Sequence, residues 1–197
     1  MEFRRSETPR GSGVSLNPMT YCDYCRENPD DPWHVPYHDT LYGFPVEDDD
    51  KLFERLVLEI NQAGLSWLTI LKKAESFRRA YSGFSIDAVA AYGDADRQRL
   101  LSDAGIIRNR LKIDAAIENA RRLVEIRTTH GSFHGWLAAQ HPRSKDEWTK
   151  LFKKTFRFTG GEIVNEFLMS TGWLPGAHDE SCPVHSKLRG VNPPWVL

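Results

Sequence analysis

The sequence lacks a long apolar run, since no stretch approaches the roughly 20 uninterrupted apolar residues that a bilayer-spanning helix needs. The charged N-terminus, residues 1–10, is not followed by the apolar core of a secretory signal peptide. The chain also lacks an excess of one charge, because 26 Lys and Arg residues face 27 Asp and Glu residues. We therefore expect a soluble, intracellular protein with no membrane partner, on which any surface for a polyanion is local.

Cysteine is scarce too, with three residues in a chain of 197. Three are too few for a disulfide framework in a chain of this length, and an odd number leaves at least one sulfur unpaired. The cysteines are therefore considered as possible metal ligands. Possible ligands form two groups near opposite ends of the chain: Cys22, Cys25 and His38, then His178, Cys182 and His185.

Together the two groups could hold one zinc ion, which in a closed structural site takes four ligands in a tetrahedron and accepts thiolate and imidazole. His178 and Cys182 are four residues apart, a spacing that brings both side chains to one point on a helix or a tight loop. A shared ion would tie the ends of the chain together. A split of two plus two ligands is less specific than two Cys-x-x-Cys pairs, so ordinary thiols and surface histidines stay an alternative.

Apolar residues recur at helical spacing through most of the chain. The pattern predicts a helix from 50 to 62, a break at Gly64 and a second helix that reaches Phe77. Further helices are predicted where the spacing returns, around 86–90, 97–101, 113–126, 133–139, 147–152 and 162–169. Neither an internal repeat nor a series of alternating strands is present, so the predicted fold class is all-α, with helices packed on helices.

The length suits one globular domain. We expect residues 1–17, which have almost no apolar side chains, to be a mobile tail, residues 18–187 to be one helical domain and residues 188–197 to be a C-terminal tail. Residues 21–50 carry four prolines and no sustained periodicity. They are expected to form an ordered loop region that is held in place by something outside the segment.

One carboxylate interrupts the apolar face of the predicted helix 50–62. Glu59 lies seven residues after Leu52 and three after Leu56, on the face that both share. A carboxylate there is costly unless it has a partner or a purpose. Two interpretations stay open, a buried Glu satisfied by the backbone or an Arg, and a hydrogen-bond acceptor on a pocket wall. Trp67 could line the same cavity or belong to the core.

A glycine turn with basic residues separates the predicted helices 97–101 and 113–126. Gly105 suits the left-handed conformation that ends a helix, and Ile106 can make the apolar contact that closes such a cap. Backbone amides at the start of the next helix, flanked by Arg108, Arg110 and Lys112, could bind a phosphate without reading sequence. A helical corner with solvated basic residues would have the same pattern.

Four strings carry a family resemblance: YHD at 37–39, DDDKLF at 48–53, LEINQAGLSWLTILKK at 58–73 and DAGIIRNRLKI at 103–113. Over about residues 19–182 the chain resembles the DNA-3-methyladenine glycosylase I family of helix-hairpin-helix glycosylases. The resemblance implies a helix-hairpin-helix DNA glycosylase fold with one structural zinc ion joining the N- and C-terminal segments. By matching position the zinc ligands would be Cys22, His38, His178 and Cys182, with Cys25 and His185 as neighbours or substitutes.

Members of that family cut 3-methyladenine from alkylated DNA. On matching positions, Glu59 would be the catalytic residue that accepts hydrogen bonds from the flipped base, Trp67 would stack on the base, and Tyr37 and Tyr42 would line the pocket. A buried anion would favour the damaged base, because methylation at N3 makes adenine cationic. The family does not rely on an aspartate after the hairpin, so the resemblance gives Asp114 no catalytic role.

The partner that the resemblance implies is double-stranded DNA with alkylated bases, contacted through Gly105, Arg108, Arg110 and Lys112. We expect a monofunctional enzyme of base-excision repair, a monomer that acts in the cytoplasm in association with the nucleoid.

The chain departs from the family pattern in its pocket. Tyr42 stands where a Trp is usual, and the pattern near the end of the chain is changed at Gly161, Asn165 and Met169. These changes leave open a shifted range of lesions, or a DNA-damage binding module of the same fold without catalysis. A catalytic metal with an open fourth position is a further alternative, which four protein ligands would exclude.

Overall fold

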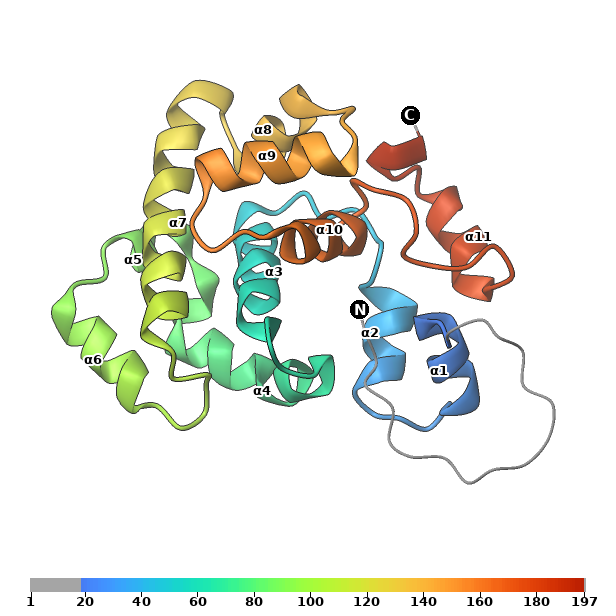
Figure 1. Cartoon of the computed structure of the whole chain (residues 1–197), viewed down its shortest axis with the longest axis horizontal. Coiled ribbons are helices and arrows are strands. Elements are labelled where there is room, and N and C mark those ends of the chain that lie inside the picture. Colours follow the sequence, from blue (N-terminus) through green and yellow to red (C-terminus); the bar gives the residue numbers. More distant parts are fainter. Residues whose placement is uncertain (1–18, 197) are drawn as a thin grey trace.

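Eleven α-helices, with no strand, make up the part of the chain that the structure describes, a computed structural model of residues 19–196 (Figure 1). In chain order the helices are α1 (Tyr21–Glu27), α2 (His34–Thr40), α3 (Asp49–Gln62), α4 (Trp67–Ala80), α5 (Ile86–Ala90), α6 (Asp94–Ser102), α7 (Arg110–His130), α8 (Phe133–Gln140), α9 (Lys145–Thr155), α10 (Gly161–Ser170) and α11 (Pro183–Gly190). Short 3-10 turns lie at Ser82–Phe84 and Pro194–Val196. The all-α prediction is confirmed.

Side-chain caps explain where the predicted helices begin. The Asp48 carboxylate accepts a hydrogen bond from the Lys51 amide at 2.9 Å and starts α3. Ser66 caps α4 two residues after Gly64, whose φ of 82° interrupts the helical conformation between α3 and α4. Ser144 and Glu147 form a capping box at the start of α9. The capped starts lie close to those that the apolar spacing predicts.

Helix α3 lies in the middle of the fold. The long helix α7 runs beside it and α10 crosses it, while α8 and α9 lie above and α4 lies below in Figure 1. Its apolar side chains are almost completely buried, among them Leu52, Phe53, Leu56 and Ile60. Glu59 belongs to this enclosed helix and is 1% exposed. The carboxylate therefore lies inside the protein rather than at its surface.

The expected loop region at residues 21–50 contains two helices instead. Helix α1 begins with a capping box, in which Thr20 and Asp23 bond to each other's backbone amides. Helix α2 follows after a turn and carries Pro36 in its first turn, where proline is tolerated. Seven residues make only two turns, too few for a periodic apolar pattern to stand out. The prediction missed both helices for that reason.

The two ends of the described chain lie side by side, with α11 next to α1 and α2 (Figure 1). Residues from 188 onward, expected to be a tail, continue α11 to Gly190, and Leu188 is buried. The Trp195 amide then donates a hydrogen bond to the Gly172 carbonyl at 3.3 Å. This segment therefore packs on the domain as far as residue 196. The tail expected at residues 1–17 lies outside the described residues.

Within the described residues, no helix combines the length and the apolar character that a membrane span requires.

Candidate active site and metal centre

Four side chains from the two ends of the chain meet in a buried group. Their potential ligand atoms all lie within 4.8 Å of one another, and the group consists of Cys22, His38, His178 and Cys182. The nitrogens of the two histidines are 3.2 Å apart, and the sulfur-to-nitrogen distances run from 3.4 to 3.9 Å. In a tetrahedral zinc site the corresponding edges are about 3.3–3.8 Å. The four side chains therefore fit one tetrahedral ion.

Each histidine of this group is fixed by its second ring nitrogen. His38 Nδ1 lies 2.7 Å from Asp39 Oδ1, and His178 Nε2 lies 2.8 Å from the Tyr42 carbonyl oxygen. These acceptors hold the proton on the far side of each ring, so the nitrogens that face the group carry lone pairs. Burial lowers the pKa of His178, which favours the neutral imidazole that a metal binds. The histidines are therefore oriented as metal ligands.

The Cys22 thiol needs a nearby cation to ionise. Burial raises the pKa of the Cys22 thiol to about 12, so the thiolate form requires the charge of a bound ion. Cys25 lines the same hollow of about 400 Å³ as Cys22 but does not belong to the group of four. The His185 ring instead lies parallel to the Trp195 ring, with centroids 6.4 Å apart. Neither alternative ligand is needed to complete a four-coordinate site.

A glycine lets the chain pass close to this group. Gly43 has a φ of 86°, in the region that favours glycine, and a Cβ there would lie 2.8 Å from the Cβ of Ala177. The Gly43 amide donates to the Ser170 carbonyl at 3.0 Å. This close approach places Tyr42, the residue before Gly43, between the metal group and α10.

Three aromatic rings form a second buried cluster beside the first. Tyr37 lies between Trp67 and Tyr42, with centroid distances of 5.1 and 5.7 Å. All three rings are at most 5% exposed. The indole Nε1 of Trp67 has no hydrogen-bond partner among the described residues. The structure thus brings together the three rings that the sequence predicted for a base pocket.

Glu59 belongs to the same cluster, because its charge acts on the hydroxyls of both Tyr37 and Tyr42. Its Oε1 atom is buried and has no hydrogen-bond partner among the described residues. Burial, reinforced by the charge of Glu166, raises the pKa of the Glu59 carboxyl to about 8. Neighbours among the described residues therefore do not satisfy the whole carboxylate, and the interpretation of Glu59 as an acceptor on a pocket wall stays a prediction.

Two further charged residues of this cluster were not predicted. The Arg55 guanidinium lies 4.9 Å from the centre of the Tyr37 ring, and its Nη1 donates to the Tyr37 hydroxyl at 2.8 Å. Glu166 on α10 accepts a hydrogen bond from the Tyr42 hydroxyl at 3.2 Å. The signal for Glu166 was available, since it interrupts an apolar run that includes Val164, Phe167 and Leu168.

The hairpin between α6 and α7 is present, but the reason for its glycine differs from the expected one. Gly105 does not adopt the left-handed conformation, so the predicted helix cap is wrong. A Cβ there would lie 2.9 Å from Asp103 Oδ1 and 3.1 Å from the Cβ of Ser76 on α4. The Gly105 amide is already bound to Asp103 Oδ1 at 2.7 Å. The close approach of the hairpin to α4 is what requires glycine.

The basic residues of the hairpin fall into two kinds. Arg108 and Arg110 are exposed, as phosphate contacts need to be. Lys112 is 5% exposed, and its ammonium donates to the carbonyls of Asn61 and Ala63 at 2.9 and 2.7 Å. The Lys112 ammonium therefore stabilises the turn between α3 and α4 and does not face solvent.

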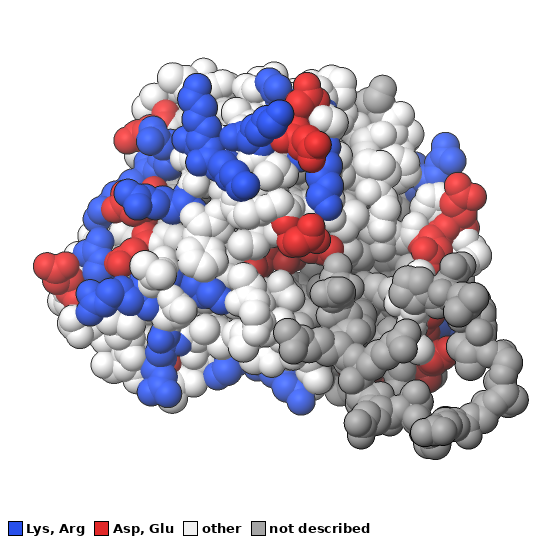
Figure 2. Space-filling model, in the orientation of Figure 1, with Lys and Arg blue, Asp and Glu red and all other residues white. Residues whose placement is uncertain are grey.

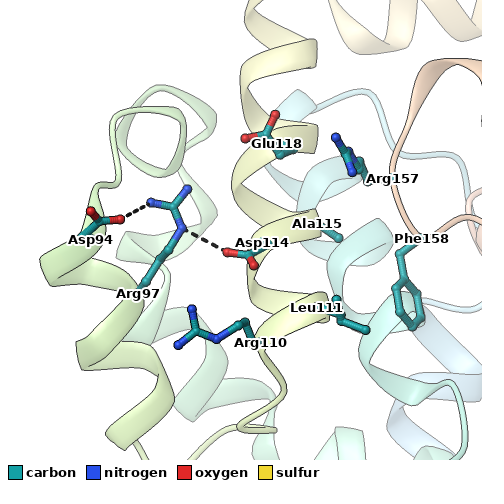
Figure 3. Close-up of a pocket in the computed structure, with 9 residues that line it drawn as sticks. All are labelled: Asp94, Arg97, Arg110, Leu111, Asp114, Ala115, Glu118, Arg157 and Phe158. Carbon is teal, nitrogen blue, oxygen red and sulfur yellow. Dashed lines mark hydrogen bonds and ion pairs between the residues drawn. The ribbon is translucent and has the colours of Figure 1, made fainter.

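A hollow of about 640 Å³ lies beside the hairpin, between α6, α7 and the segment that follows α9 (Figure 3). In it Arg97 joins Asp94 at 3.1 Å and Asp114 at 3.0 Å. Arg110 and Arg157 line the same hollow. The Asp114 carboxylate is therefore engaged by Arg97.

The positive and negative charges of the chain nearly cancel, but the charged side chains are unevenly distributed over its surface. Lys and Arg side chains gather over α6, α7 and α9 in the left and upper parts of the view in Figure 2. A local basic surface of this kind suits a phosphate backbone without requiring a basic protein.

Comparison with known proteins gives one consistent result. The methyladenine glycosylase family matches residues 27–150. DNA-3-methyladenine glycosylase 1 of Escherichia coli is 38% identical over 171 residues, which cover 77% of this chain and 91% of that protein. DNA-3-methyladenine glycosylase of Haemophilus influenzae is 32% identical over 169 residues, with 76% and 91% covered. The structure of 3-methyladenine DNA glycosylase I from Staphylococcus aureus superposes with a TM-score of 0.73 at 32% identity, covering 84% of this chain and 97% of that one.

Proposed function

The chain belongs to the methyladenine glycosylase family, and on this premise we propose that it is a 3-methyladenine DNA glycosylase. It hydrolyses the bond between the damaged base and deoxyribose. The observation that carries the proposal is the buried cluster of Glu59, Trp67 and Tyr37. It leaves a carboxylate oxygen and an indole N–H without partners among the described residues, beside tilted aromatic rings. A flat, cationic base supplies hydrogen-bond donors for the carboxylate oxygen and ring atoms that can accept from the indole N–H.

The reaction needs the base outside the helix, because the glycosidic bond and the ring edges are inaccessible inside a duplex. The flipped base is held against Trp67, while Glu59 accepts hydrogen bonds from its donor edge. Tyr37 and Tyr42 form the remaining wall. Stacking on aromatic rings offsets part of the free energy lost when the base leaves the duplex, about 1–3 kcal/mol per base.

Charge explains why a damaged base leaves and a normal one stays. A nucleoside methylated at N3 carries a positive charge, so when the glycosidic bond breaks, the bonding electron pair neutralises the base and no proton has to be donated. Water adds its hydroxyl to the sugar carbon and releases a proton. A cationic base favours the ionised form of the buried Glu59 and is stabilised by it. Neutral adenine gains nothing from this charge, so the pocket favours the alkylated base.

The hairpin holds the DNA. Arg108 and Arg110 contact phosphates near the hairpin, and the backbone around Gly105 approaches the same strand. Lys112 contributes by holding the α3–α4 turn, which connects Glu59 to Trp67, against the hairpin. One copy of the chain carries the pocket, the hairpin and the metal group, which supports action as a monomer.

The metal that we propose for this group is zinc, in a structural role. Two thiolates and two imidazoles are the donor set that zinc prefers, and four protein ligands would leave no open position for water. Cys22, His38, His178 and Cys182 would hold the ion and so fasten α1 and α2 to the segment before α11. The chemistry at the base is left to the pocket residues.

The test is release of free bases from methylated duplex DNA by the purified, zinc-loaded protein. Chromatography separates 3-methyladenine from 7-methylguanine. We expect release of 3-methyladenine. Release of 7-methylguanine alone would mean a shifted range of lesions, and tight binding to abasic DNA without release of either base would mean a damage-binding module. Either result would overturn the proposed activity.

A further inference from the structure

Phe158 has an unusual backbone conformation at the protein surface. It lies between α9 and α10, and its φ of 60° is in the left-handed region, which is strained for a bulky side chain. Phe84 has nearly the same φ, 61°, but its ring is completely buried, so packing in the core offsets the strain. Phe158 is 39% exposed. Packing within the described chain therefore accounts for Phe84 better than for Phe158.

Helix α7 holds the chain in this conformation. The Asn119 side chain accepts a hydrogen bond from the Arg157 amide at 2.7 Å and donates one to the Arg157 carbonyl at 3.1 Å. Asn119 is almost completely buried, so water does not compete for these bonds. Thr159, on the other side of Phe158, is buried too. The backbone on both sides of Phe158 is therefore fixed, and its ring is held at the surface.

A second exposed apolar side chain lies across the hollow beside the hairpin from Phe158 (Figure 3). This residue is Leu111, in the first turn of α7, and it is 66% exposed. Its neighbour Lys112 places its ammonium 6.0 Å from the centre of the Phe158 ring. The same ammonium binds the α3–α4 turn. Leu111 and Phe158 therefore form an exposed apolar pair close to the turn that leads into the base pocket.

An exposed arginine directly precedes each member of this pair. Arg110 precedes Leu111, Arg157 precedes Phe158, and both arginines line the same hollow. The carboxylates of the hollow are each bound to another arginine: Asp94 and Asp114 to Arg97, and Glu118 to Arg121. Arg110 and Arg157 therefore remain for an anionic partner, and the surface directly beside them is apolar.

We propose that Leu111 and Phe158 make an apolar contact with duplex DNA, in which they pack against deoxyribose rings next to the phosphates that Arg110 and Arg157 bind. DNA fits this combination because every phosphate is joined through an oxygen to a sugar with an apolar C–H face. An acidic protein segment has no such face at a fixed distance from each charge. The inference rests on the proposed function, since it takes the hairpin to be the DNA-binding surface.

A sugar contact adds affinity without reading sequence, as a glycosylase that searches for rare lesions requires. It also positions the strand. The Phe158 ring is fixed by its backbone, and Lys112 links its surroundings to the turn between Glu59 and Trp67. The contact therefore holds the strand in a set place relative to the base pocket, and Phe158 is a positioning residue.

The first test uses Leu111→Ala in the zinc-loaded, full-length protein. Leu111 is mostly exposed and alanine favours the helix, so Tm should be unchanged. Binding to undamaged duplex DNA should weaken about threefold, because apolar surface that DNA would cover is lost. The slope of log affinity against log salt should equal that of wild type, since no charge is removed. Arg110→Ala, in contrast, should make this slope shallower.

The second test uses Phe158→Gly, which removes the ring from a conformation that glycine adopts without strain. Relief of the strain offsets part of the lost packing, so Tm should change by a few degrees at most. Binding to duplex DNA should weaken about fivefold, again with an unchanged salt slope. Phe158→Tyr keeps an aromatic ring at this position and should restore the affinity of wild type.

Val191→Ala is the matched control for loss of an exposed apolar side chain. Val191 is 51% exposed and follows α11, on the other side of the fold from the hairpin (Figure 1). Its affinity for duplex DNA should equal that of wild type. Affinity for the free base 3-methyladenine should be unchanged in every variant, because the base pocket is intact, whereas KM for methylated duplex DNA should rise in Leu111→Ala and Phe158→Gly.

The inference and the proposed function fail in different measurements. Absence of base release by wild type would overturn the proposed function. Equal binding of duplex DNA by wild type, Leu111→Ala and Phe158→Gly would overturn the inference alone, as would an equal loss in Val191→Ala. A shallower salt slope in either variant would contradict an apolar contact. A smaller apparent mass of Leu111→Ala in gel filtration, with unchanged DNA binding, would assign the pair to a second copy of the chain and would also overturn the inference.

Discussion

Two buried polar clusters lie on either side of Tyr42, and they are completed in different ways. In the metal group, His38 and His178 each have a fixed acceptor for one ring nitrogen, and the other nitrogen points to the two sulfurs. In the base pocket, Glu59 Oε1 and Trp67 Nε1 are buried without partners among the described residues. Tyr42 joins the clusters, because its carbonyl accepts from His178 and its hydroxyl donates to Glu166.

The difference separates a site that stabilises the fold from one that binds a substrate. A buried polar atom without a partner costs about 1–3 kcal/mol. One bound ion would spare the metal group this cost, because the four ligand side chains already lie together. The pocket lowers the stability of the free protein by this amount until a ligand binds, as is common at functional sites. Substitutions in the two clusters should therefore change stability in opposite directions.

The largest effect is expected at the metal group. Cys182→Ser removes one of four ligands, and because metal binding is coupled to folding it should lower Tm by roughly 10 °C or more and reduce the zinc content of the purified protein. Calorimetry and metal analysis check it. Cys25→Ser is the control, since Cys25 is buried nearby but outside the group, and it should keep its zinc. An unchanged Tm and zinc content in Cys182→Ser would contradict metal binding by this group.

A substitution of Glu59 in the pocket is expected to raise the free energy of unfolding rather than lower it. The pKa of Glu59 is raised to about 8 in the folded protein, so the folded state holds this proton more tightly than the unfolded chain does. The free energy of unfolding therefore falls as pH rises from about 4.5 to 8, and Glu59→Gln should recover up to about 3 kcal/mol at neutral pH. Denaturant unfolding measures it. A gain that is equal at pH 4.5 and pH 8 would contradict a buried, titrating Glu59.

An intermediate effect is expected where the hairpin meets the pocket. Lys112→Met keeps the length of the side chain but removes both hydrogen bonds to the α3–α4 turn, so unfolding should become easier by about 2 kcal/mol. Lys72→Met is the control, because Lys72 is exposed on α4. If both variants unfold at the same denaturant concentration, Lys112 does not support the turn.

The smallest effects are expected at the exposed arginines. Arg108→Ala and Arg110→Ala should leave Tm unchanged and weaken binding to undamaged duplex DNA a few-fold. The slope of log affinity against log salt should become shallower by about one for each phosphate that the variant no longer neutralises. Fluorescence anisotropy at several salt concentrations measures both. Lys187→Ala on α11 serves as the control, and an equal weakening there would place the DNA elsewhere.

The sequence was sufficient for the long helices because their signals are local. Asp48 caps α3, and its apolar residues recur along one face. The short helices α1 and α2 were missed because seven residues carry too little periodicity. Gly105 was identified as a required glycine, but the neighbour that requires it, Ser76, is distant in sequence.

The candidate site was predictable only in part, for the same physical reason. Glu59 stood out because its own helix is apolar on that face. Glu166 and Arg55 acquire their roles only when α10 crosses α3 and Tyr37 lies against both, which no local pattern contains. The selection of four metal ligands among six candidates came from the family resemblance. The three-dimensional arrangement then brought those four together and left out Cys25 and His185.

A buried carboxylate in an aromatic pocket is proposed to recognise a cationic base. The most direct test is release of 3-methyladenine from methylated duplex DNA by wild type and by Glu59→Gln, both zinc-loaded, with 3-methyladenine and 7-methylguanine separated by chromatography. We expect wild type to release 3-methyladenine and Glu59→Gln, though folded and more stable, to be slower by roughly a hundredfold. Equal rates for the two proteins would contradict it.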